Sequence, residues 1–498
     1  MKTYFFIRKF KLQSRIVILY ISLLLTNNTI EAQWAQLGQN VFNESQSFGS
    51  VSLNVDGSVL AIGVPQDRFS NSNGYARIYR NNNDVWAQIG QDIVGEALGD
   101  AFGKSISLSS DGSIVAIGAP GNDGNYVGSG HVRVFQNIND VWTQLGNDID
   151  GGKGSSEING IELGDFSGLS VSLNADGSVV AIGAMLSGDN GFQSGIVKMY
   201  QYNNDSWLLK GSAILGENEE DLSGVSVSLS ENGSLVAIGA HGNDENGTNA
   251  GHVRIFEYNN TDWVQVGLNI NGEAGEASGI NVSLSKDGAI VAVGANNSKY
   301  TRVYRNINNV WTQIGEDILV YSLNSKGRVE VSLNNDGAYL FAGMPNAFSN
   351  QGYGRLYKNN NDSWLQINDQ IIGGQTADYF GTTVDINNDG SAIVIGGLGN
   401  NSSGIGMGLV KVFQNEAVLS TNEFSNLAVS IYPNPTNNFL NINSKYPIEK
   451  VEIYSILGKK VFESKTTSTI ILDKLSSGMY LVKIRSNNSF FSKRLMIN

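Results

Sequence analysis

The chain has 498 residues, enough for one large closed fold or two to three ordinary domains. It is rich in glycine (59) and poor in proline (6), and charged residues make up 16%, a composition typical of an all-β protein with many turns. Cysteine is absent, which excludes disulfides and thiolate chemistry, and the net charge of −13 argues against nucleic acid as a partner.

Residues 1–32 have the pattern of a secretory signal peptide. Five basic residues precede a ten-residue apolar run at 16–25, and a polar stretch ends at Ala32 before Gln33, so we predict cleavage between these two residues. A membrane anchor is the alternative, but a bilayer span needs about 20 apolar residues. No later segment is apolar enough to span, and we expect no transmembrane segment in the mature chain.

A repeat organises residues 33–416. The seven tryptophans mark the same place in one unit of about fifty residues, at positions 34, 86, 142, 207, 263, 311 and 364. Each unit contains an Asp-Gly or Asn-Gly dipeptide between two strand-like runs, which is a strong hairpin signal. An apolar run such as 114–118 follows, and then a strand such as 130–135 and an Asn-rich turn. Four antiparallel strands, seven times, predict a seven-bladed β-propeller.

The two ends of the repeat region predict how the ring closes. The first unit opens with a Trp strand, whereas the last ends at 409–413 without one. We therefore expect residues 34–38 to complete the last blade beside 409–413, which removes an unpaired edge.

The unit resembles the FG-GAP repeat of integrin-type propellers, over roughly 33–415. The likeness rests on Phe102-Gly103, Asp111-Gly112, Gly118-Ala119-Pro120 and the run 132–135. The calcium loop of that family survives once, with Asp385, Asn387 and Asp389 at alternate positions before Gly390, so the resemblance implies a calcium site there. The alternative is a plain hairpin, because the six equivalents of Asp385 are serines: Ser52, Ser107, Ser172, Ser228, Ser283 and Ser332.

After a linker at 417–428, residues 429–498 resemble the C-terminal sorting domain of the type IX secretion system of Bacteroidetes. Four blocks carry the likeness, at 432–435, 451–461, 475–484 and 493–498. The resemblance implies a small immunoglobulin-like β-sandwich, contact with the type IX machinery, and a secreted or outer-surface location. Alternating apolar residues in 451–453 and 480–484 agree with a sandwich. An accessory carbohydrate-binding sandwich is the alternative.

The long loops of the repeats carry most acidic residues. Residues 33–418 hold 40 acidic and 18 basic residues, a net of −22. In an antiparallel meander alternate loops lie on one face, so we predict an acidic long-loop face that could bind a ligand, or simply a solvated rim. The candidate binding residues are Asp123, Asp148, Asp150, Glu219, Asp221 and Asp244.

No catalytic constellation stands out. His131 and His252 occupy one repeat position at a strand start and are expected to be structural, and His241 is alone in a loop. The tryptophans recur in every unit, which favours packing anchors over sugar platforms. We therefore expect a non-catalytic adhesion module that binds an extracellular glycan or protein. The alternative is a polysaccharide lyase or glycosidase, which would need blade-specific groups near the axis.

The signal and sorting segments predict the form of the secreted protein. We expect the mature chain to begin near Gln33 and the tail after about 419 to be removed or used for surface attachment. N-terminal sequencing and intact mass of the exported protein measure both ends. A full-length species retained in the cytoplasm would contradict the prediction.

Overall fold

The computed structural model describes residues 34–44, 49–65, 72–158, 160–322, 325–398 and 408–415 of the repeat region. In the tail it describes 429–432, 436, 439–444, 448–455, 459–465, 469–472, 474–486 and 489–497. The predicted signal peptide with Ala32 and Gln33, and the linker 417–428, lie outside the described residues. The chain divides into two units, Met1–Glu416 and Ala417–Asn498.

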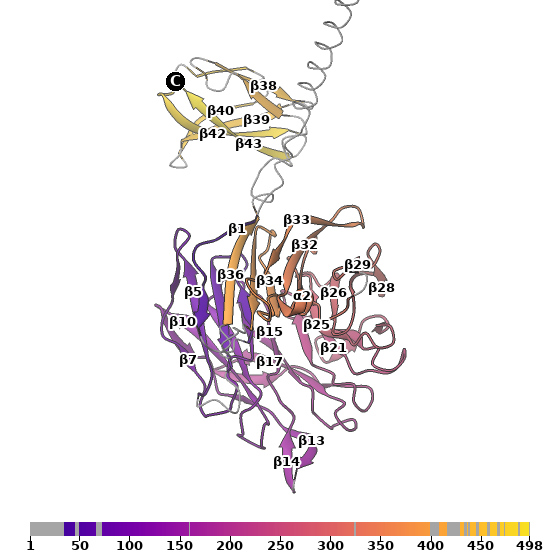
Figure 1. Ribbon diagram of the computed structural model, residues 1–498. Coiled ribbons are helices and arrows are strands. Elements are labelled where there is room, and N and C mark those ends of the chain that lie inside the picture. Colours follow the sequence, from indigo (N-terminus) through magenta and orange to yellow (C-terminus); the bar gives the residue numbers. More distant parts are fainter. Residues whose placement is uncertain are drawn as a thin grey trace, which may run out of the picture. The chain divides into compact units, whose positions relative to one another are not determined.

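The first unit contains seven similar antiparallel sheets (Figure 1). Their first strands are β3 (Val51–Leu53), β8 (Ser105–Leu108), β15 (Ser170–Leu173), β20 (Ser226–Leu229), β25 (Ser278–Leu284), β30 (Glu330–Leu333) and β34 (Thr383–Ile386). Their second strands are β4 (Val59–Val64), β9 (Ile114–Ala119), β16 (Val179–Ala184), β21 (Leu235–Ala240), β26 (Ile290–Ala295), β31 (Tyr339–Met344) and β35 (Ala392–Gly397).

The third strands start from the long loops. They are β5 (Tyr75–Asn81), β10 (His131–Ile138), β17 (Ile196–Asn203), β22 (His252–Tyr258), β27 (Tyr300–Ile307), β32 (Tyr353–Asn359) and β36 (Gly408–Asn415). The fourth strands begin at or within three residues of the tryptophans: β6 (Trp86–Gln88), β11 (Val141–Gln144), β18 (Ser206–Leu209), β23 (Trp263–Gln265), β28 (Val310–Gln313), β33 (Trp364–Ile372) and β1 (Trp34–Gln36).

Six sheets add a short fifth strand on the third, whereas the long strand β33 fills both places in the remaining sheet. The short strands are β7 (Ile93–Val94), β12 (Ile149–Asp150), β19 (Ile214–Leu215), β24 (Ile270–Asn271), β29 (Ile318–Leu319) and β2 (Phe42–Glu44). Two insertions depart from the repeat. One is the hairpin of β13 (Lys153–Ile158) and β14 (Ile161–Gly164), which projects from the body in Figure 1, and the other is the short helical turn α2 (Ala347–Asn350).

The seven sheets form a closed ring, which defines a β-propeller. Each first strand contacts the first strand of the next sheet, and β34 contacts β3. A ring of backbone hydrogen bonds follows the same order just beyond these strands, with N···O distances of 2.8–3.4 Å. Each N–H donates to the carbonyl of the next residue in the following order, and the last returns to the first: Val55, Ser110, Ala175, Glu231, Lys286, Asn335 and Asn388.

The second strands are apolar because neighbouring sheets cover both of their faces. All six residues of β4, β16, β26 and β35 are buried. Glycine permits the close approach of the next sheet: a Cβ on Gly118 would lie 2.0 Å from the carbonyl oxygen of Gly168, which itself has a φ of +84°. The apolar run and its glycine are therefore two consequences of one packing arrangement.

The tryptophans link the outer parts of the sheets. Each indole N–H donates to a backbone carbonyl of the preceding sheet, as in Trp142 to Ile89 at 3.0 Å and Trp311 to Val266 at 2.8 Å. Trp34 completes this set by donating to Asp369 at 2.9 Å. All seven indoles are thus committed to joining sheets, which is the packing role that their periodicity predicts.

Ring closure uses the N-terminal segment, as predicted. Strand β1 pairs with β36, with Trp34 opposite Asn415, and lies beside it in Figure 1. Strand β2 adds a second pairing, with Phe42 opposite Val410, and the Phe42 side chain is 2% exposed. The closure therefore involves both an edge hydrogen-bond ladder and a buried aromatic ring.

The second unit contains two sheets around a shared apolar core. One sheet has the order β37 (Val429–Tyr432), β38 (Phe439–Ser444), β41 (Thr469–Ile471), and the other β40 (Lys460–Ser464), β39 (Ile448–Ser455), β42 (Gly478–Ser486), β43 (Ser489–Ile497). Leu440 and Ile470 of the first sheet pack with Val451, Ile453 and Val482 of the second. In the described parts of both units, no helix combines the length and the apolar character that a membrane crossing requires.

We predict that Phe42→Ala strongly destabilises the ring. Replacing a buried phenylalanine by alanine costs about 3–5 kcal/mol, and this one lies in the closure. The expected result is a lower midpoint of urea unfolding. Val85→Ala, at a 56% exposed side chain in a turn, is the control and should change little. Equal midpoints for Phe42→Ala and the wild type would show that the N-terminal strands do not close the ring.

Candidate functional site

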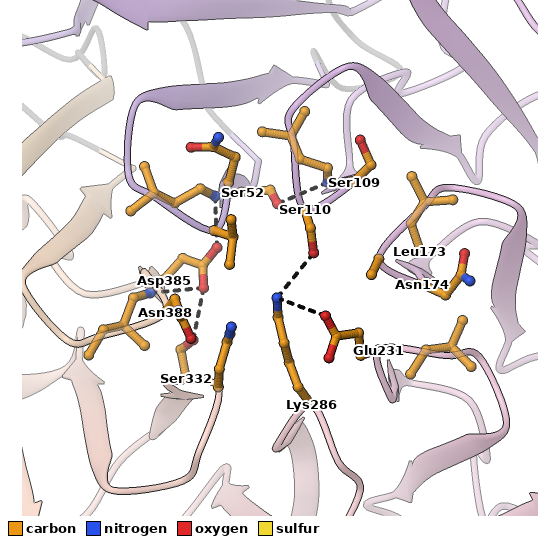
Figure 2. A pocket seen from close by; sticks show the side chains of 18 of the residues that line it. Ser52, Ser109, Ser110, Leu173, Asn174, Glu231, Lys286, Ser332, Asp385 and Asn388 are labelled. Carbon is orange, nitrogen blue, oxygen red and sulfur yellow. Dashed lines mark hydrogen bonds and ion pairs between the residues drawn. The ribbon is translucent and has the colours of Figure 1, made fainter. Parts of the chain in front are cut away.

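The first strands surround the axis of the ring, which we call the axial channel, and a cavity lies at each of its two ends, or mouths. At the ends of these strands, next to the Asp-Gly and Asn-Gly turns, residues of all seven sheets line a cavity of about 190 Å³. Lys286 of the fifth sheet spans this mouth, since its Nζ donates to Ser110 Oγ of the second sheet at 3.1 Å and lies 3.7 Å from Glu231 (Figure 2). This mouth is small, and its lysine already has protein partners.

The repeated serines hold neighbouring first strands together inside the channel. Each of five serine hydroxyls accepts the backbone N–H of a leucine in the next sheet, at 2.9–3.0 Å. The pairs are Ser52 with Leu108, Ser107 with Leu173, Ser172 with Leu229, Ser228 with Leu284, and Ser283 with Leu333. The serines at the first position of the calcium-loop motif are therefore structural links between sheets.

Asp385 makes the corresponding link between the last sheet and the first. Its carboxylate accepts the Leu53 N–H at 2.8 Å and the Ser332 hydroxyl at 2.8 Å (Figure 2). It also accepts the N–H of Ile386 at 2.9 Å. Burial raises the pKa of this carboxyl, and these hydrogen bonds partly offset the rise.

The other two residues of the predicted calcium site have separate partners. Asn387 Oδ1 accepts the Ala392 N–H at 2.9 Å, and Asp389 Oδ1 accepts the Ser391 N–H at 2.9 Å. The same two turn contacts recur in sister repeats, for example from Asn174 and Asp176. The link between the last sheet and the first thus explains the carboxylate at position 385 without a cation. The calcium site stays a prediction.

The other mouth of the channel is a larger cavity of about 550 Å³ at the starts of the first strands. Serine and threonine hydroxyls line much of it, including Ser50, Ser105, Ser170, Ser226, Thr382 and Thr383. Three basic side chains and one acid interrupt this lining: Lys104, His241, Arg328 and Glu330. They come from three sheets, since Lys104 precedes β8, His241 follows β21, and Arg328 and Glu330 lie at the start of β30. The ring therefore brings together residues that are far apart in the sequence.

Burial and the charge of Arg328 shift the pKa values of the other two basic groups. Burial lowers the pKa of His241, and the charge of Arg328 lowers it further. The pKa of Lys104 is lowered for the same two reasons, although Glu330 opposes the change. Glu330 is hydrogen-bonded to Arg328 and raises the pKa of that guanidinium. The single carboxylate is therefore already paired, and Lys104 makes no ion pair within the described part of the chain.

Sequence reasoning missed this cavity, although a signal was present. Each of the four residues breaks the repeat: Lys104 stands where sister units have Leu169 or Val225, and His241 stands where the second unit has Pro120. Such breaks beside the first strands are blade-specific groups near the axis. The sequence could reveal these residues only if the positions that differ from the repeat were compared across all units, rather than the positions that match it.

The predicted acidic binding residues differ in their surroundings. Asp123 and Asp244 each accept a backbone N–H within their own loop, from Gly128 and Asn249 at 2.7 and 2.6 Å. Both therefore shape the long loops.

The remaining four predicted residues have different surroundings. Asp221 is 1% exposed, accepts the Asn218 N–H at 2.9 Å, and has a pKa raised by burial. Asp148 lies 3.9 Å from His131, whereas Asp150 and Glu219 are exposed. The predicted set thus combines loop-shaping, buried and solvent-facing carboxylates.

Two histidine–carboxylate clusters lie near the starts of third strands, outside the channel. They consist of Glu96, His131 and Asp148, and of Glu217, Glu245 and His252. In each cluster the ligand-type atoms lie within 4.8 Å of one another. The equivalence of His131 and His252 indicated a structural role in the sequence, and the carboxylates around them were not foreseen as neighbours.

Comparison with known proteins identifies the tail. Residues 430–498 match the family model of the secretion system C-terminal sorting domain. A 77-residue stretch is 35% identical to part of an ulvan lyase, NLR42, of Nonlabens ulvanivorans, and this match covers 14% of each chain. The protein is therefore exported by type IX secretion to the cell surface or the surroundings of a Bacteroidetes bacterium.

Solved structures match the chain at low identity. The β-propeller domain of Cps50 (Swd1) from Myceliophteria thermophila is 11% identical, with a TM-score of 0.49 over 75% of this chain and 98% of that one. Hydrazine synthase of Kuenenia stuttgartiensis is 11% identical, with a TM-score of 0.48 over 71% and 92%. At these scores the likeness says nothing about a ligand, and the propeller fold rests on the closed ring itself.

We predict that Asp385→Ser, which restores the residue of the sister repeats, alters the pH dependence of stability. A carboxyl whose pKa is raised above its ordinary 3.8 contributes stability below that value, and this contribution is lost as pH rises through the folded pKa. The wild-type Tm should therefore fall more steeply than that of Asp385→Ser above about pH 4, measured by calorimetry. Asp336→Asn, in a sister turn, is the control.

The same variant tests the calcium site. If Ca²⁺ binds at Asp385, calcium chloride raises the Tm of the wild type and not that of Asp385→Ser, because a ligand of the folded state stabilises it by mass action. An equal calcium response in both proteins would rule out this location.

Proposed function

We propose that this protein is a non-catalytic surface or secreted module that binds an acidic saccharide, one bearing carboxylate or sulfate groups, in the axial cavity at the long-loop end. The observation that supports this proposal most is the group of Lys104, His241 and Arg328. The one carboxylate in the described lining beside them, Glu330, is already paired with Arg328. An anion would complete this charge balance. Adhesion to an acidic matrix or polysaccharide is the role that fits such a site.

Charge supports an anionic ligand in particular. The repeat region has a large excess of acids, so a basic cavity on its axis is a local reversal of the overall field. Burial and the charge of Arg328 lower the pKa values of Lys104 and His241, so a positive charge on either group is unfavourable when no ligand is bound. Binding of a carboxylate or sulfate offsets that cost, and we expect both pKa values to rise in the complex.

Size and lining support a saccharide. A cavity of about 550 Å³ falls within the range of about 300–1,000 Å³ that small-ligand sites occupy. Its hydroxyl-rich wall offers both donors and acceptors, which suits sugar hydroxyls. The described lining has no phenylalanine, tyrosine or tryptophan, so we expect the affinity to depend mainly on charge and to fall as salt concentration rises.

The architecture proposed for this role is a seven-bladed propeller of the FG-GAP type, followed by an immunoglobulin-like sorting domain. The number of sheets supports the blade count. Phe102 is fully buried, and Gly103, with a φ of +93°, lies against the preceding sheet, which supports a structural role for the Phe-Gly motif. The signal peptide would start export, and the tail would direct passage through the outer membrane.

A polysaccharide lyase is the second candidate, and the lowered pKa of His241 favours it. A neutral imidazole can take the proton from the carbon next to a sugar carboxylate, while Arg328 neutralises that carboxylate. The electron pair then forms the double bond as the glycosidic oxygen departs and takes up a proton. The likeness to an ulvan lyase covers 14% of this chain and supplies no residues for this step.

We predict that Lys104→Met weakens binding of acidic oligosaccharides by about 10- to 100-fold. A hydrogen bond to a charged group contributes about 1.5–3 kcal/mol, and each tenfold in Kd is about 1.4 kcal/mol. The measurement is a glycan array with neutral, uronate-containing and sulfated oligosaccharides, followed by calorimetric titration of the acidic hits.

The matched control is Lys286→Met, at the opposite mouth of the same channel, which should keep the wild-type affinity. Binding of neutral glycans or acidic peptides alone, or an unchanged affinity in Lys104→Met, would contradict the proposal. A parallel assay for unsaturated products decides on the second candidate: their appearance with wild type and loss in His241→Gln would make the protein a lyase.

A further inference from the structure

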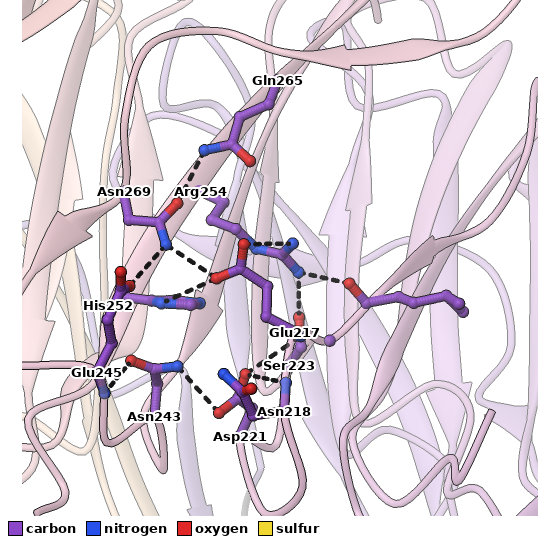
Figure 3. Close-up of polar contacts among 12 residues, drawn as sticks. Glu217, Asn218, Asp221, Ser223, Asn243, Glu245, His252, Arg254, Gln265 and Asn269 are labelled. Atoms are coloured by element: carbon purple, nitrogen blue, oxygen red, sulfur yellow. Dashed lines mark hydrogen bonds and ion pairs between the residues drawn. The ribbon is translucent and has the colours of Figure 1, made fainter. Parts of the chain in front are cut away.

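The cluster around His252 lies outside the axial cavity and is assembled from two loops and the start of a strand. Glu217 follows β19 of the third sheet, Glu245 lies in the long loop between β21 and β22, and His252 begins β22 (Figure 3). The long loops bring these residues together where one sheet meets the next. Nothing in the ring closure or in the axial cavity uses them.

His252 has an unusual environment for a buried histidine. Its side chain is 0% exposed, and neither ring nitrogen has a hydrogen-bond partner among the described residues. Burial, with a contribution from Arg254, lowers its pKa to about 3, so the imidazole is neutral at physiological pH. A buried polar group without a partner costs stability, and it needs an explanation.

The distances around His252 suit a metal ion better than a hydrogen bond. Nδ1 lies 3.7 Å from Glu217 Oε2, too far for a hydrogen bond. Two ligands at about 2.1 Å from a tetrahedral zinc ion stand about 3.4 Å apart. All three ligand-type atoms, including one of Glu245, lie within 4.8 Å of one another. A small inward movement would bring them to coordination distance.

The carboxylates are already oriented by neighbours that are not ligands. Asn269 Nδ2 donates to Glu217 Oε2 at 2.8 Å and to Glu245 Oε2 at 3.0 Å, and Asn269 Oδ1 accepts from Gln265 at 2.8 Å (Figure 3). Outer hydrogen bonds of this kind commonly position metal-binding carboxylates. Both glutamates reach solvent, which leaves access for an ion and for a water ligand.

We propose that Glu217, Glu245 and His252 form a site for a divalent transition metal such as Zn²⁺, and that Glu96, His131 and Asp148 form a second one. An imidazole with two carboxylates is a ligand set that suits zinc and related ions, whereas Ca²⁺ prefers oxygen ligands alone. The second cluster has the same types of residue: His131 is 1% exposed, and its Nδ1 lies 3.9 Å from Asp148 Oδ2.

Sister repeats provide an internal comparison. In two repeats with tyrosine in place of the histidine, the arginine two residues later pairs tightly with the local acid: Arg77 with Asp92 and Arg302 with Asp317, both at 2.8 Å. In the two histidine repeats the closest carboxylate atoms lie 3.7 Å from Arg133 and from Arg254. The negative charge of the acids next to histidine is thus less neutralised by the arginine, and a bound cation can neutralise it instead.

The test is calorimetric titration of the tag-free full chain with zinc chloride in metal-free buffer. We expect the wild type to bind two Zn²⁺ per chain. His131→Gln and His252→Gln should each bind one, and the double variant should bind none at these sites. Co²⁺ provides a second readout, since its visible absorption band should halve in each single variant. Glu257→Gln, an exposed acid on the same strand β22, is the matched control and should bind like the wild type.

A variant with an exposed ligand keeps the test valid if a histidine variant fails to fold. Glu245→Gln leaves the core untouched, and we expect it to weaken one of the two sites at least tenfold without a change in the circular dichroism spectrum. The proposal is overturned if the wild type binds no zinc, or if Glu245→Gln and the double histidine variant bind zinc as the wild type does. Saccharide binding by Lys104→Met is measured separately, so the two proposals can fail independently.

Discussion

The ring of seven backbone hydrogen bonds around the axis is the constraint on which the rest of the structure depends. Each bond joins the turn region of one sheet to that of the next, and the last returns to Val55. A ring of this kind closes only if every sheet has the same angle and spacing, so the repeat must be kept in each unit. The serine contacts inside the channel and the indole contacts farther out follow the same order and reinforce it.

This constraint explains why so much of the fold could be predicted from the sequence. The tryptophans, the Asp-Gly and Asn-Gly turns and the apolar second strands recur because each unit solves the same packing problem. The absence of a Trp strand in the last unit indicated the closure by residues near Trp34, and the pairing of Trp34 with Asn415 confirms it. Strand β2 was not foreseen, because its short sequence has no feature that separates it from a loop.

The candidate sites were harder to predict, for the same physical reason. A repeat makes its regular residues conspicuous, and in the structure these make structural contacts: the serines link sheets, and Asp123 and Asp244 accept backbone N–H groups of their own loops. The functional candidates are departures such as Lys104, His241 and Arg328, which lie in different units. Only the curvature of the ring brings them together, and no pattern along one strand contains that information. The histidine clusters required the loop geometry as well, since Glu217 and Glu245 belong to different connections.

The closure by β1 and β2 also has a kinetic consequence. These strands pair with β36, which lies at the opposite end of the repeat region, so the contact with the greatest sequence separation is also the one that completes the ring. Contacts of this kind form slowly, because the chain must lose much conformational entropy before they are made. During synthesis and export, six sheets can assemble before the seventh receives its outer strands. Until β1 and β2 pair with it, β36 would lack its outer partners, and the lifetime of that open arc would set the period in which chaperones, proteases or a second chain can act on it.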